Sequence, residues 1–367
     1  MFRKFIIFFL LFSGVHLLSS DFELKTNAEN NTLDQISRNA TSTGQDIINC
    51  ITFVNCYLVT GGQNGFIHFY DPNTLQLKFK LENSGNIPGP ITAIVPYEKT
   101  FIFADSYGRV RICQNIGEND FTLPFKISQL PLLTLKKFQN KNLKDYFLTA
   151  SRKMIGVISF NEGDDDILFK FDLEEEEIEI ASLEMINDTL IVAGLNNGTI
   201  LFLEIDWEEK KFILSKELNA HKDKVSALCN VNGKYLLSGS NDKTVKIWNL
   251  KTLNCDQPYK FDSEVNIITF DKENNKALIG LNSQFLINLD LTTMKYESVP
   301  NNTIYISAIY NSADYLAVAS SGSRLTVYPK KKQLARTRLK QKGQTKVNSM
   351  DLQKDGNSDK NSDNMEQ

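Results

Sequence analysis

Short aliphatic runs alternate with polar turns along most of the chain, which predicts β-strands. The pattern is clearest at 225–250. The runs 225–230 and 235–240 flank Asn232 and Gly233, a dipeptide that favours a hairpin turn. After a second polar turn at 241–243, the stretch 244–250 alternates and predicts a third strand. This segment therefore predicts three consecutive antiparallel strands.

The same unit recurs at a nearly constant interval, which predicts a repeat architecture. Seven first strands are expected to begin near Ile47, Ile91, Leu132, Ile180, Val225, Val265 and Ile304. Consecutive starts lie 39 to 48 residues apart, close to the period of about 40–45 residues typical of a four-stranded repeat. The third unit, 132–173, is the least regular.

The unit at 220–250 resembles a WD40 repeat of a β-propeller. The resemblance implies a side-chain network of a His before the first strand, a Ser in the second, an Asp in the next turn and a Trp in the third. These positions carry His221, Ser238, Asp242 and Trp248. A Ser-His-Asp hydrolase triad is the alternative, but the spacing and the tryptophan favour a structural network, which is cooperative when fully satisfied.

The other six units lack parts of this network. At the Trp248 position they carry Tyr70, Cys113, Ser159, Leu203, Leu289 and Tyr328. At the Asp242 position they carry Asn64, Tyr107, Lys153, Asn197, Ser283 and Gly322. We expect these units to be held together by apolar packing between neighbouring blades.

These observations predict an all-β fold, a seven-bladed WD40-like β-propeller over residues 47–329. The seventh unit ends its third strand at Tyr328 and Pro329. Closing the ring therefore requires an outer strand from elsewhere, which also removes a free edge. We expect it from residues 21–46, through the alternating run 22–25. The basic run 334–339 is the competing segment.

Residues 1–20 resemble a secretory signal peptide, since Arg3 and Lys4 precede the apolar run 5–12. An uncleaved anchor, or no targeting role, is the alternative, and the apolar run is short for a membrane span. We expect a luminal or extracellular protein, with membrane contact only if the segment stays uncleaved. Glycosylation sequons occur at Asn30, Asn39, Asn187, Asn197 and Asn301, but no more often than chance gives in an asparagine-rich chain.

The C-terminal region differs in composition. Residues 330–346 carry eight basic side chains and no acidic one, and 347–367 are polar without periodicity, which predicts a disordered tail. The basic stretch fits a solvated tail, or else a nuclear address or a contact with RNA or anionic membrane. A nuclear or cytoplasmic location is thus the alternative to secretion. Because the net charge is −3, nucleic-acid binding is expected only through 330–346.

The sequence offers little for catalysis. It holds three histidines and five cysteines, without metal-ligand spacing and without a phosphate-binding loop. The acidic runs 164–166 and 174–177 bracket the predicted outer strand of the third unit, so we expect them on opposite faces and not in one metal site. We predict no catalytic residues, no metal and no cofactor. Free thiols are expected, with a disulfide as the alternative in a secreted chain.

The leading hypothesis is a non-enzymatic protein-interaction scaffold of the WD40 type. A nuclear WD40 component of RNA or ribosome assembly is one alternative, and a quinoprotein-like propeller enzyme is the other. The resemblance implies that the loops before first strands and between second and third strands share one face. Mixed charge there suits a protein partner. The residues of this predicted partner face are Glu174, Glu175, Glu176, Glu177, Lys222, Lys224, Asn241 and Lys243.

Overall fold

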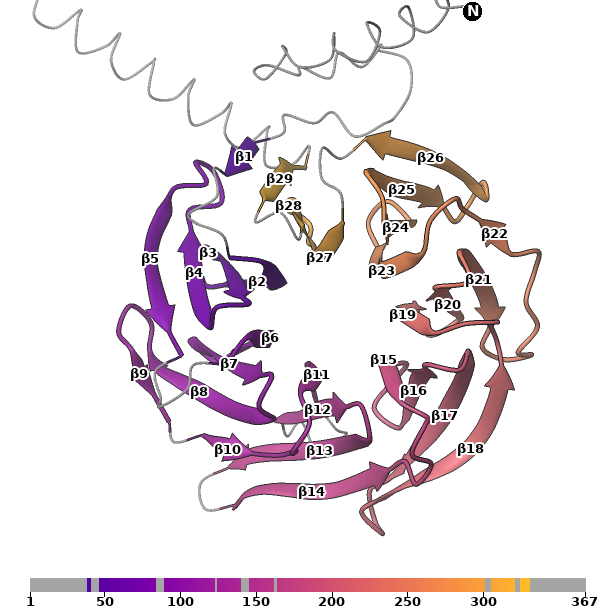
Figure 1. Cartoon of the computed structure of the whole chain (residues 1–367), viewed down its shortest axis with the longest axis horizontal. Helices are drawn as coiled ribbons and strands as arrows, with labels where there is room; N and C mark the ends of the chain where they lie inside the picture. The colour runs from indigo at the N-terminus through magenta and orange to yellow at the C-terminus, as the bar shows by residue number, and fades with distance from the viewer. Residues whose placement is uncertain are drawn as a thin grey trace, which may run out of the picture. The chain divides into compact units, whose positions relative to one another are not determined.

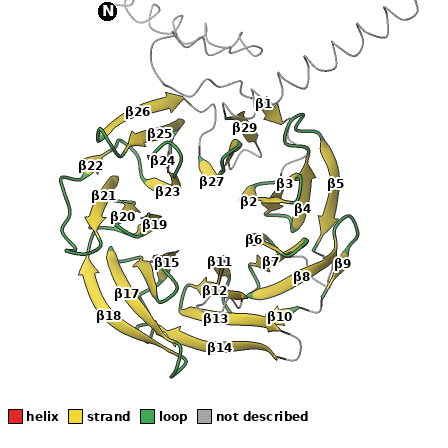
Figure 2. Ribbon diagram, turned by 180° about the vertical axis from the view of Figure 1, so that it is seen from behind, coloured by secondary structure: helices red, strands yellow, loops and turns green. Residues whose placement is uncertain are grey.

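The strand-forming runs of the chain assemble into seven antiparallel β-sheets (Figure 1). The computed structural model describes residues 38–40, 46–83, 89–122, 124–139, 145–161, 164–300, 305–320 and 324–330. Over these ranges no residue is helical, and no membrane-spanning helix is found among them. Within the unit Arg38–Tyr328 the sheets follow one another around a ring, as Figure 2 shows from behind. The predicted seven-bladed, all-β propeller is confirmed.

The strands of each blade run outward from the centre of the ring in chain order, except that the outermost strand of blade 7 is residues 38–40. Blade 1 is β2 (Ile48–Val54), β3 (Tyr57–Gly62), β4 (Phe66–Tyr70) and β5 (Leu77–Glu82). Blade 2 is β6 (Ile91–Tyr97), β7 (Thr100–Asp105), β8 (Arg109–Asn115), β9 (Asp120–Phe121) and β10 (Phe125–Lys126), the last two both paired with β8. Blade 3 is β11 (Leu132–Gln139), β12 (Asp145–Ser151), β13 (Met154–Asn161) and β14 (Asp164–Asp172).

The remaining blades repeat this order. Blade 4 is β15 (Ile180–Met185), β16 (Leu190–Leu195), β17 (Thr199–Asp206) and β18 (Lys211–Asn219). Blade 5 is β19 (Val225–Val231), β20 (Tyr235–Ser240), β21 (Thr244–Asn249) and β22 (Tyr259–Lys260). Blade 6 is β23 (Val265–Asp271), β24 (Lys276–Leu281), β25 (Phe285–Asp290) and β26 (Lys295–Pro300). Blade 7 is β27 (Ile306–Asn311), β28 (Tyr315–Ser320) and β29 (Leu325–Pro329), with β1 (Arg38–Ala40) outermost.

One position in blade 3 differs from the sequence alignment. Phe147 pairs with Ile158, as Leu236 pairs with Trp248 in blade 5. Ile158, and not Ser159, therefore stands at the Trp248 position. The reason is a shorter turn: Ala150 pairs with Ile155, one residue sooner than Gly239 pairs with Val245.

The ring closes through β1, which pairs antiparallel with β29 so that Arg38 lies opposite Val327. The closing strand thus comes from the segment 21–46, but from 38–40 and not from the run 22–25. That run and the competing run 334–339 lie outside the described residues, as do the signal-like segment 1–20 and the tail 331–367.

The core is divided among the blade interfaces. Seven clusters of buried hydrophobic side chains occur, and each joins two neighbouring blades. Blades 4 and 5, for example, share Phe202 and Val225 in one cluster with Trp248. Apolar packing between blades is therefore present at every interface, including those without a polar network.

The inner edge of the ring repeats one local device. The register shifts after the first residue of β2, β6, β11, β15, β19, β23 and β27, which marks a β-bulge in every innermost strand. In blade 4, Ser182 next to the bulge donates its hydroxyl to the Val225 carbonyl of blade 5 at 2.7 Å. Opposite the bulge stands Gly194, where a Cβ would lie 2.7 Å from Cγ1 of Val225. A glycine is needed there because the next blade packs so closely.

Candidate functional site

Four side chains of blade 5 form one buried hydrogen-bond network. His221 precedes β19, Ser238 lies in β20, Asp242 lies in the turn before β21, and Trp248 lies in β21. His221 Nδ1 is 3.0 Å from Asp242 Oδ2, and His221 Nε2 is 2.7 Å from Ser238 Oγ. Trp248 Nε1 donates to the same hydroxyl oxygen at 2.8 Å. The structure thus brings together the four residues that the resemblance implied.

The two residues at the ends of this network, Trp248 and Asp242, determine the direction of each hydrogen bond between them. Trp248 can only donate, and an ionised Asp242 can only accept. Ser238 therefore accepts from Trp248 and donates to Nε2 of His221, which leaves Nδ1–H of His221 to donate to Asp242. Every member is satisfied by a neutral imidazole with its proton on Nδ1.

The pKa values agree with that assignment. Burial lowers the pKa of His221, although the nearby Asp242 carboxylate acts in the opposite direction. Burial acts to raise the pKa of Asp242, but hydrogen bonds from the Thr244 side chain and the Lys222 amide outweigh it, so this pKa is lowered. The contact between His221 and Asp242 is hence a hydrogen bond donated by a neutral ring and not an ion pair at neutral pH.

The same geometry argues against the hydrolase alternative. The order Ser238, His221, Asp242 matches a catalytic triad in its hydrogen bonds. Ser238, however, is 0 % exposed, and its oxygen is occupied by Trp248. No substrate carbonyl can reach this hydroxyl, so the network holds the blade together and does not attack a substrate.

Blade 2 contains a second buried network that the sequence did not predict. Asp105, at the end of β7, is buried, and its Oδ2 lies 2.7 Å from both Nε and Nη2 of Arg109. Asn83, from the end of blade 1, donates to Oδ2 at 3.2 Å, and the Tyr107 amide donates to Oδ1 at 2.9 Å. The signal that could have found it is an acid and an arginine at either side of a tight Tyr107–Gly108 turn.

The acidic loop 174–177 precedes blade 4 and is held from two sides. Lys153, in the turn between β12 and β13, donates from Nζ to the carbonyls of Glu175, Glu176 and Ile178 at 2.5–2.7 Å. Asn196, in the turn between β16 and β17, donates to the Glu177 carbonyl at 2.8 Å. Because these bonds use main-chain oxygens, the four glutamate side chains remain exposed.

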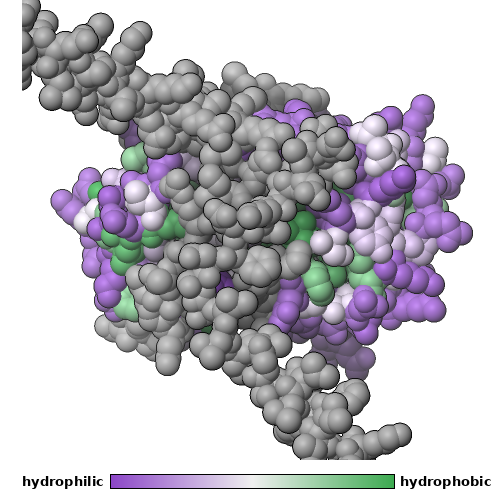
Figure 3. Space-filling model, turned by 90° about the horizontal axis from the view of Figure 1, so that it is seen from above, coloured by the Kyte–Doolittle hydropathy of each residue, from purple (hydrophilic) through white to green (hydrophobic). Residues whose placement is uncertain are grey.

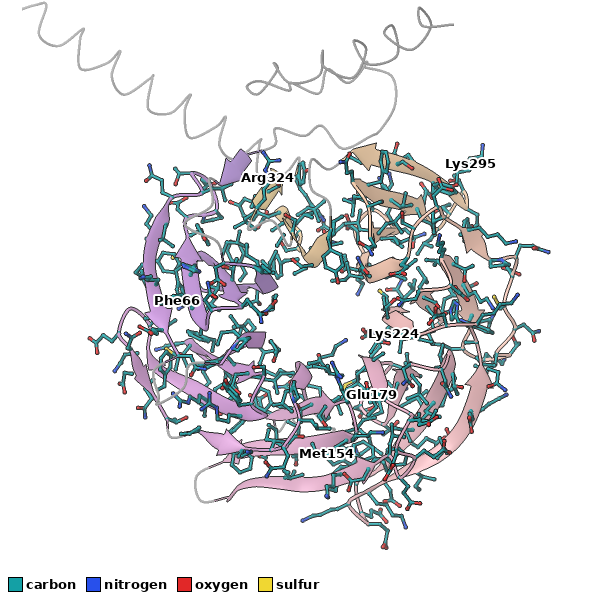
Figure 4. The ribbon with its side chains drawn as sticks, viewed as in Figure 1. Phe66, Met154, Glu179, Lys224, Lys295 and Arg324 are labelled. Carbon is teal, nitrogen blue, oxygen red and sulfur yellow. The ribbon has the colours of Figure 1, made fainter. Side chains whose placement is uncertain are left out.

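The loop before β19 in blade 5, residues 220–224, lies on the same face as the acidic loop 174–177. The amides of Ala220 and His221 donate to the carbonyl of Gly198, which is two residues from Asn196 in its turn. The amide of Asn241 donates to the Lys224 carbonyl. Lys222, Lys224 and Lys243 are exposed, whereas Asn241 is half-buried. Figure 4 labels Glu179 and Lys224 at the inner ends of neighbouring blades 4 and 5.

Exposed hydrophobic side chains occur in the corresponding loops of the other blades. Ile47, Leu130 and Tyr305 precede first strands, Tyr107 lies between β7 and β8, and Phe285 begins β25 directly after its turn. The Arg109 guanidinium lies 5.0 Å from the centre of the Tyr107 ring, which fixes this exposed aromatic group. One face of the ring therefore carries mixed charge over blades 4 and 5 and exposed apolar groups over the rest.

Comparison with known proteins agrees with this geometry. The profile of the WD40 family, described as WD domain, G-beta repeat, matches residues 212–249, which contain the network of blade 5. The WD40 domain of Pan2 from Neurospora crassa superposes with a TM-score of 0.63 over 78% of this chain and 90% of that one, at 16% sequence identity. The chain is a seven-bladed propeller of the WD40 fold, with a WD40 repeat in blade 5.

Curated relatives match part of this WD40 propeller. Protein LST8 homolog of Dictyostelium discoideum is 31% identical over 93 residues, which are 25% of this chain and 30% of that protein. Retinoblastoma-binding protein 5 homolog of Drosophila melanogaster is 34% identical over 92 residues, which are 25% of this chain and 18% of that protein. The matched segments span less than a third of either relative.

The described part of the WD40 propeller contains no cluster of three or more potential metal ligands. A cavity of about 290 Å³ lies along the inner strands of blades 3 to 6, and its charged lining is one ion pair, Lys136 with Glu184 at 2.6 Å. All five cysteines are free. Burial raises the pKa of Cys50 and of Cys229 to about 12, so both thiols are protonated and poor nucleophiles.

Two predicted sequons can be placed on the WD40 propeller. Asn187 lies in the turn before β16 and Asn197 in the turn after it, and both side chains are exposed. Because the turns are at opposite ends of β16, they lie on opposite faces. Asn39 lies in β1, while Asn30 and Asn301 lie outside the described residues.

Proposed function

We propose that this chain is a non-enzymatic scaffold that binds a protein partner through one face of the ring. This face is formed by the loops before the first strands and the turns between the second and third strands. A WD40 propeller fits an interaction scaffold. The observation that supports the proposal is the composition of this face. It combines exposed aromatic and aliphatic groups with charged loops whose backbones are already fixed.

The physical argument is pre-organisation. A loop that is ordered before binding loses less conformational entropy when a partner binds. Lys153 and Asn196 hold the acidic loop 174–177 through its carbonyls. Aromatic anchors surrounded by polar residues are typical of binding surfaces, and Tyr107 provides such an anchor. The charges of blades 4 and 5 then orient the partner.

Charge reversal tests the proposal directly. Lys222→Glu/Lys224→Glu changes the charged half of the face, and Phe285→Ala/Tyr305→Ala changes the apolar half. The matched control, Lys234→Glu/Lys272→Glu, places the same charge change in turns at the opposite ends of β19 and β23. We expect both face variants, and not the control, to lose proteins captured from cells by the wild-type chain.

The outcome that contradicts the proposal is equally specific. If capture depends only on residues 330–346, as shown by deleting that stretch, the face is not the binding site. Such a result would favour the nuclear alternative.

We also propose that the chain enters the secretory pathway, on the basis of the signal-like segment 1–20. Sequencing the N-terminus of the mature protein tests this, with Asp21 expected near the start. Retention of Met1 on cytosolic or nuclear protein would overturn it.

A further inference from the structure

The outer strand of blade 4, β18, is a long sheet edge with exposed hydrophobic side chains. It spans Lys211–Asn219 and is the last strand of its sheet, at the rim of the ring (Figure 1). Ile213 and Leu214 lie next to each other on it and are 43 % and 47 % exposed. An edge strand presents unpaired N–H and C=O groups, so a long apolar one is a template for another strand.

The other outer strands of the described ring are protected. β10 and β22 have two residues each, and β1 has three. β5 exposes Lys78 and Lys80, and β26 begins with the exposed Lys295, while its exposed Tyr296 packs its ring against Phe261. β14 is as long as β18 but carries an exposed ion pair between Lys170 and Asp172 at 2.8 Å. The uncovered part of the rim in Figure 3 shows hydrophobic residues among mainly hydrophilic ones. Short length, charge and proline are the usual protections of an edge.

A bulge limits the length that a partner strand can pair. Leu203 lies opposite Leu214 and Phe202 opposite Lys216, so Ser215 is the extra residue of β18. Lys211 to Leu214 pair one to one with β17 and form the regular part of the edge. Any added strand should therefore be short and centred on Ile213 and Leu214.

The charges on either side of Ile213 and Leu214 indicate which charges an added partner strand should have. The first charged residue on either side is a lysine, Lys211 before it and Lys216 after it. Both lysines are exposed, and neither is in an ion pair in the described residues. Antiparallel pairing of two copies with Ile213 opposite Leu214 would place Lys211 opposite Lys216. Like charges directly opposite destabilise a strand pair, so a second copy is disfavoured in this register.

We propose that β18 binds an extended segment of a partner protein by adding it as a further strand to blade 4. The segment has apolar residues opposite Ile213 and Leu214 and acidic residues on either side, opposite Lys211 and Lys216. Main-chain hydrogen bonds hold such a strand and side chains select it. This surface is on the rim, so it is separate from the face of the proposed function and does not depend on it.

Synthetic peptides test the proposal on the full chain. The probe is a fluorescent peptide of three valines with two aspartates on each side, measured by anisotropy up to millimolar protein. One control peptide has lysines in place of the aspartates. A second keeps the sequence but is N-methylated at alternate valines, which removes main-chain donors and keeps the side chains. We expect the aspartate peptide to bind and both controls to fail.

Variants of β18 sharpen the test. Lys211→Glu/Lys216→Glu should lose the aspartate peptide and gain the lysine peptide, and Leu214→Lys should lose the aspartate peptide. Lys251→Glu/Lys260→Glu makes the same charge change beside blade 5 and should keep wild-type binding. Thermal melting checks that each variant is folded.

Three results would overturn the proposal. The first is failure of the aspartate peptide to bind folded wild-type protein. The second is equal binding of the N-methylated peptide, which would mean side-chain adhesion without strand addition. The third is self-association in sedimentation that Leu214→Lys abolishes, because the occupant would then be a second copy of this chain.

Discussion

Blades 5 and 2 both fix the turn between their second and third strands with a carboxylate, but the carboxylate binds different groups. In blade 5, Asp242 accepts from a neutral His221 that comes from the preceding loop. In blade 2, Asp105 is neutralised by Arg109, four residues further along the same turn. The first network connects the loop, the turn and two strands, whereas the second fixes mainly its own turn and Asn83.

The difference shows that polar networks are optional additions to a common apolar core. Each blade interface has its own hydrophobic cluster, whether or not its blade contains a network. What a network adds is order at the face, because Asp242 also accepts the Lys222 amide at 3.1 Å and Asp105 positions Tyr107. Mutations can therefore separate two effects of a network, its contribution to the stability of the fold and its contribution to the order of the binding face.

The largest expected loss of stability is at Trp248. Trp248→Ala removes a large buried ring from the interface of blades 4 and 5 and should lower the free energy of unfolding by about 3–5 kcal/mol. Cys113→Ala, at the equivalent place in blade 2, should cost only about 1 kcal/mol. Urea denaturation monitored by far-UV circular dichroism, which does not depend on the tryptophan, compares the two variants. Equal losses would mean that the two blades are not held differently.

The next effect is expected at Asp105. Asp105→Asn leaves Arg109 without its counter-charge in a mostly buried position and should cost about 3 kcal/mol. The control is Asp172→Asn, since the exposed pair with Lys170 should contribute less than about 1 kcal/mol. A neutral result for Asp105→Asn would show that the turn of blade 2 is held by its backbone alone.

His221 should contribute less than either. His221→Ala leaves Ser238 and Asp242 with unmatched partners, at a cost of about 1–3 kcal/mol. A double-mutant cycle with Asp242→Ala should show coupling between the two residues. Strict additivity of the two losses would argue against one connected network.

The network of blade 5 should also respond to pH. Burial lowers the pKa of His221, so the unfolded chain binds a proton more readily than the folded one. The contribution of His221 to the free energy of unfolding should therefore be complete above the unfolded pKa of about 6.5. It should fall as the pH drops through that value. The pKa of Asp242 is lowered as well, and its contribution is lost only at lower pH, as that carboxylate is protonated.

Chemical denaturation between pH 8 and pH 5 measures this dependence. His221→Gln should reduce the slope, and His68→Gln should do so as well, because burial also lowers the pKa of His68. An unchanged slope in His221→Gln would mean that the imidazole has the same pKa in the folded and unfolded chain.

The smallest effect on stability is expected for the face. Lys222→Glu/Lys224→Glu changes exposed side chains and should shift the free energy of unfolding by less than about 0.5 kcal/mol. The melting temperature should stay near that of wild type while partner capture is lost. A large fall in melting temperature would show that these lysines are structural.

Periodicity was sufficient to predict the strands, because a four-stranded blade needs a nearly fixed length of chain. The first strands begin at Ile91, Leu132, Ile180, Val225 and Val265, as predicted, and within two residues of prediction in blades 1 and 7. The prediction of Ser159 at the Trp248 position was wrong because the turn of blade 3 is one residue shorter. Turn length has no period, so it leaves no repeated signal.

The polar groups were predicted unevenly for a similar reason. The network of blade 5 could be assigned because all four residue types occur at the spacing of the family. Asp105 and Arg109 match no such pattern, and their pairing depends on burial, which a local sequence does not show. The exposure of Ile213 and Leu214 also could not be predicted, because residues 212–214 are all apolar and the sequence does not show which of them is buried.

The closing pair of β1 with β29 has a consequence for the order of folding. Six blade interfaces join blades that are consecutive in the chain, whereas the seventh joins Tyr315 of blade 7 to Asn73 of blade 1, and blade 7 itself pairs Val327 with Arg38. Contacts between distant segments form slowly, since a long loop must close before they are gained. The contacts of blade 1 with blade 7 should therefore form last. Before they form, the chain is an open arc in which the other six blade interfaces can already be complete.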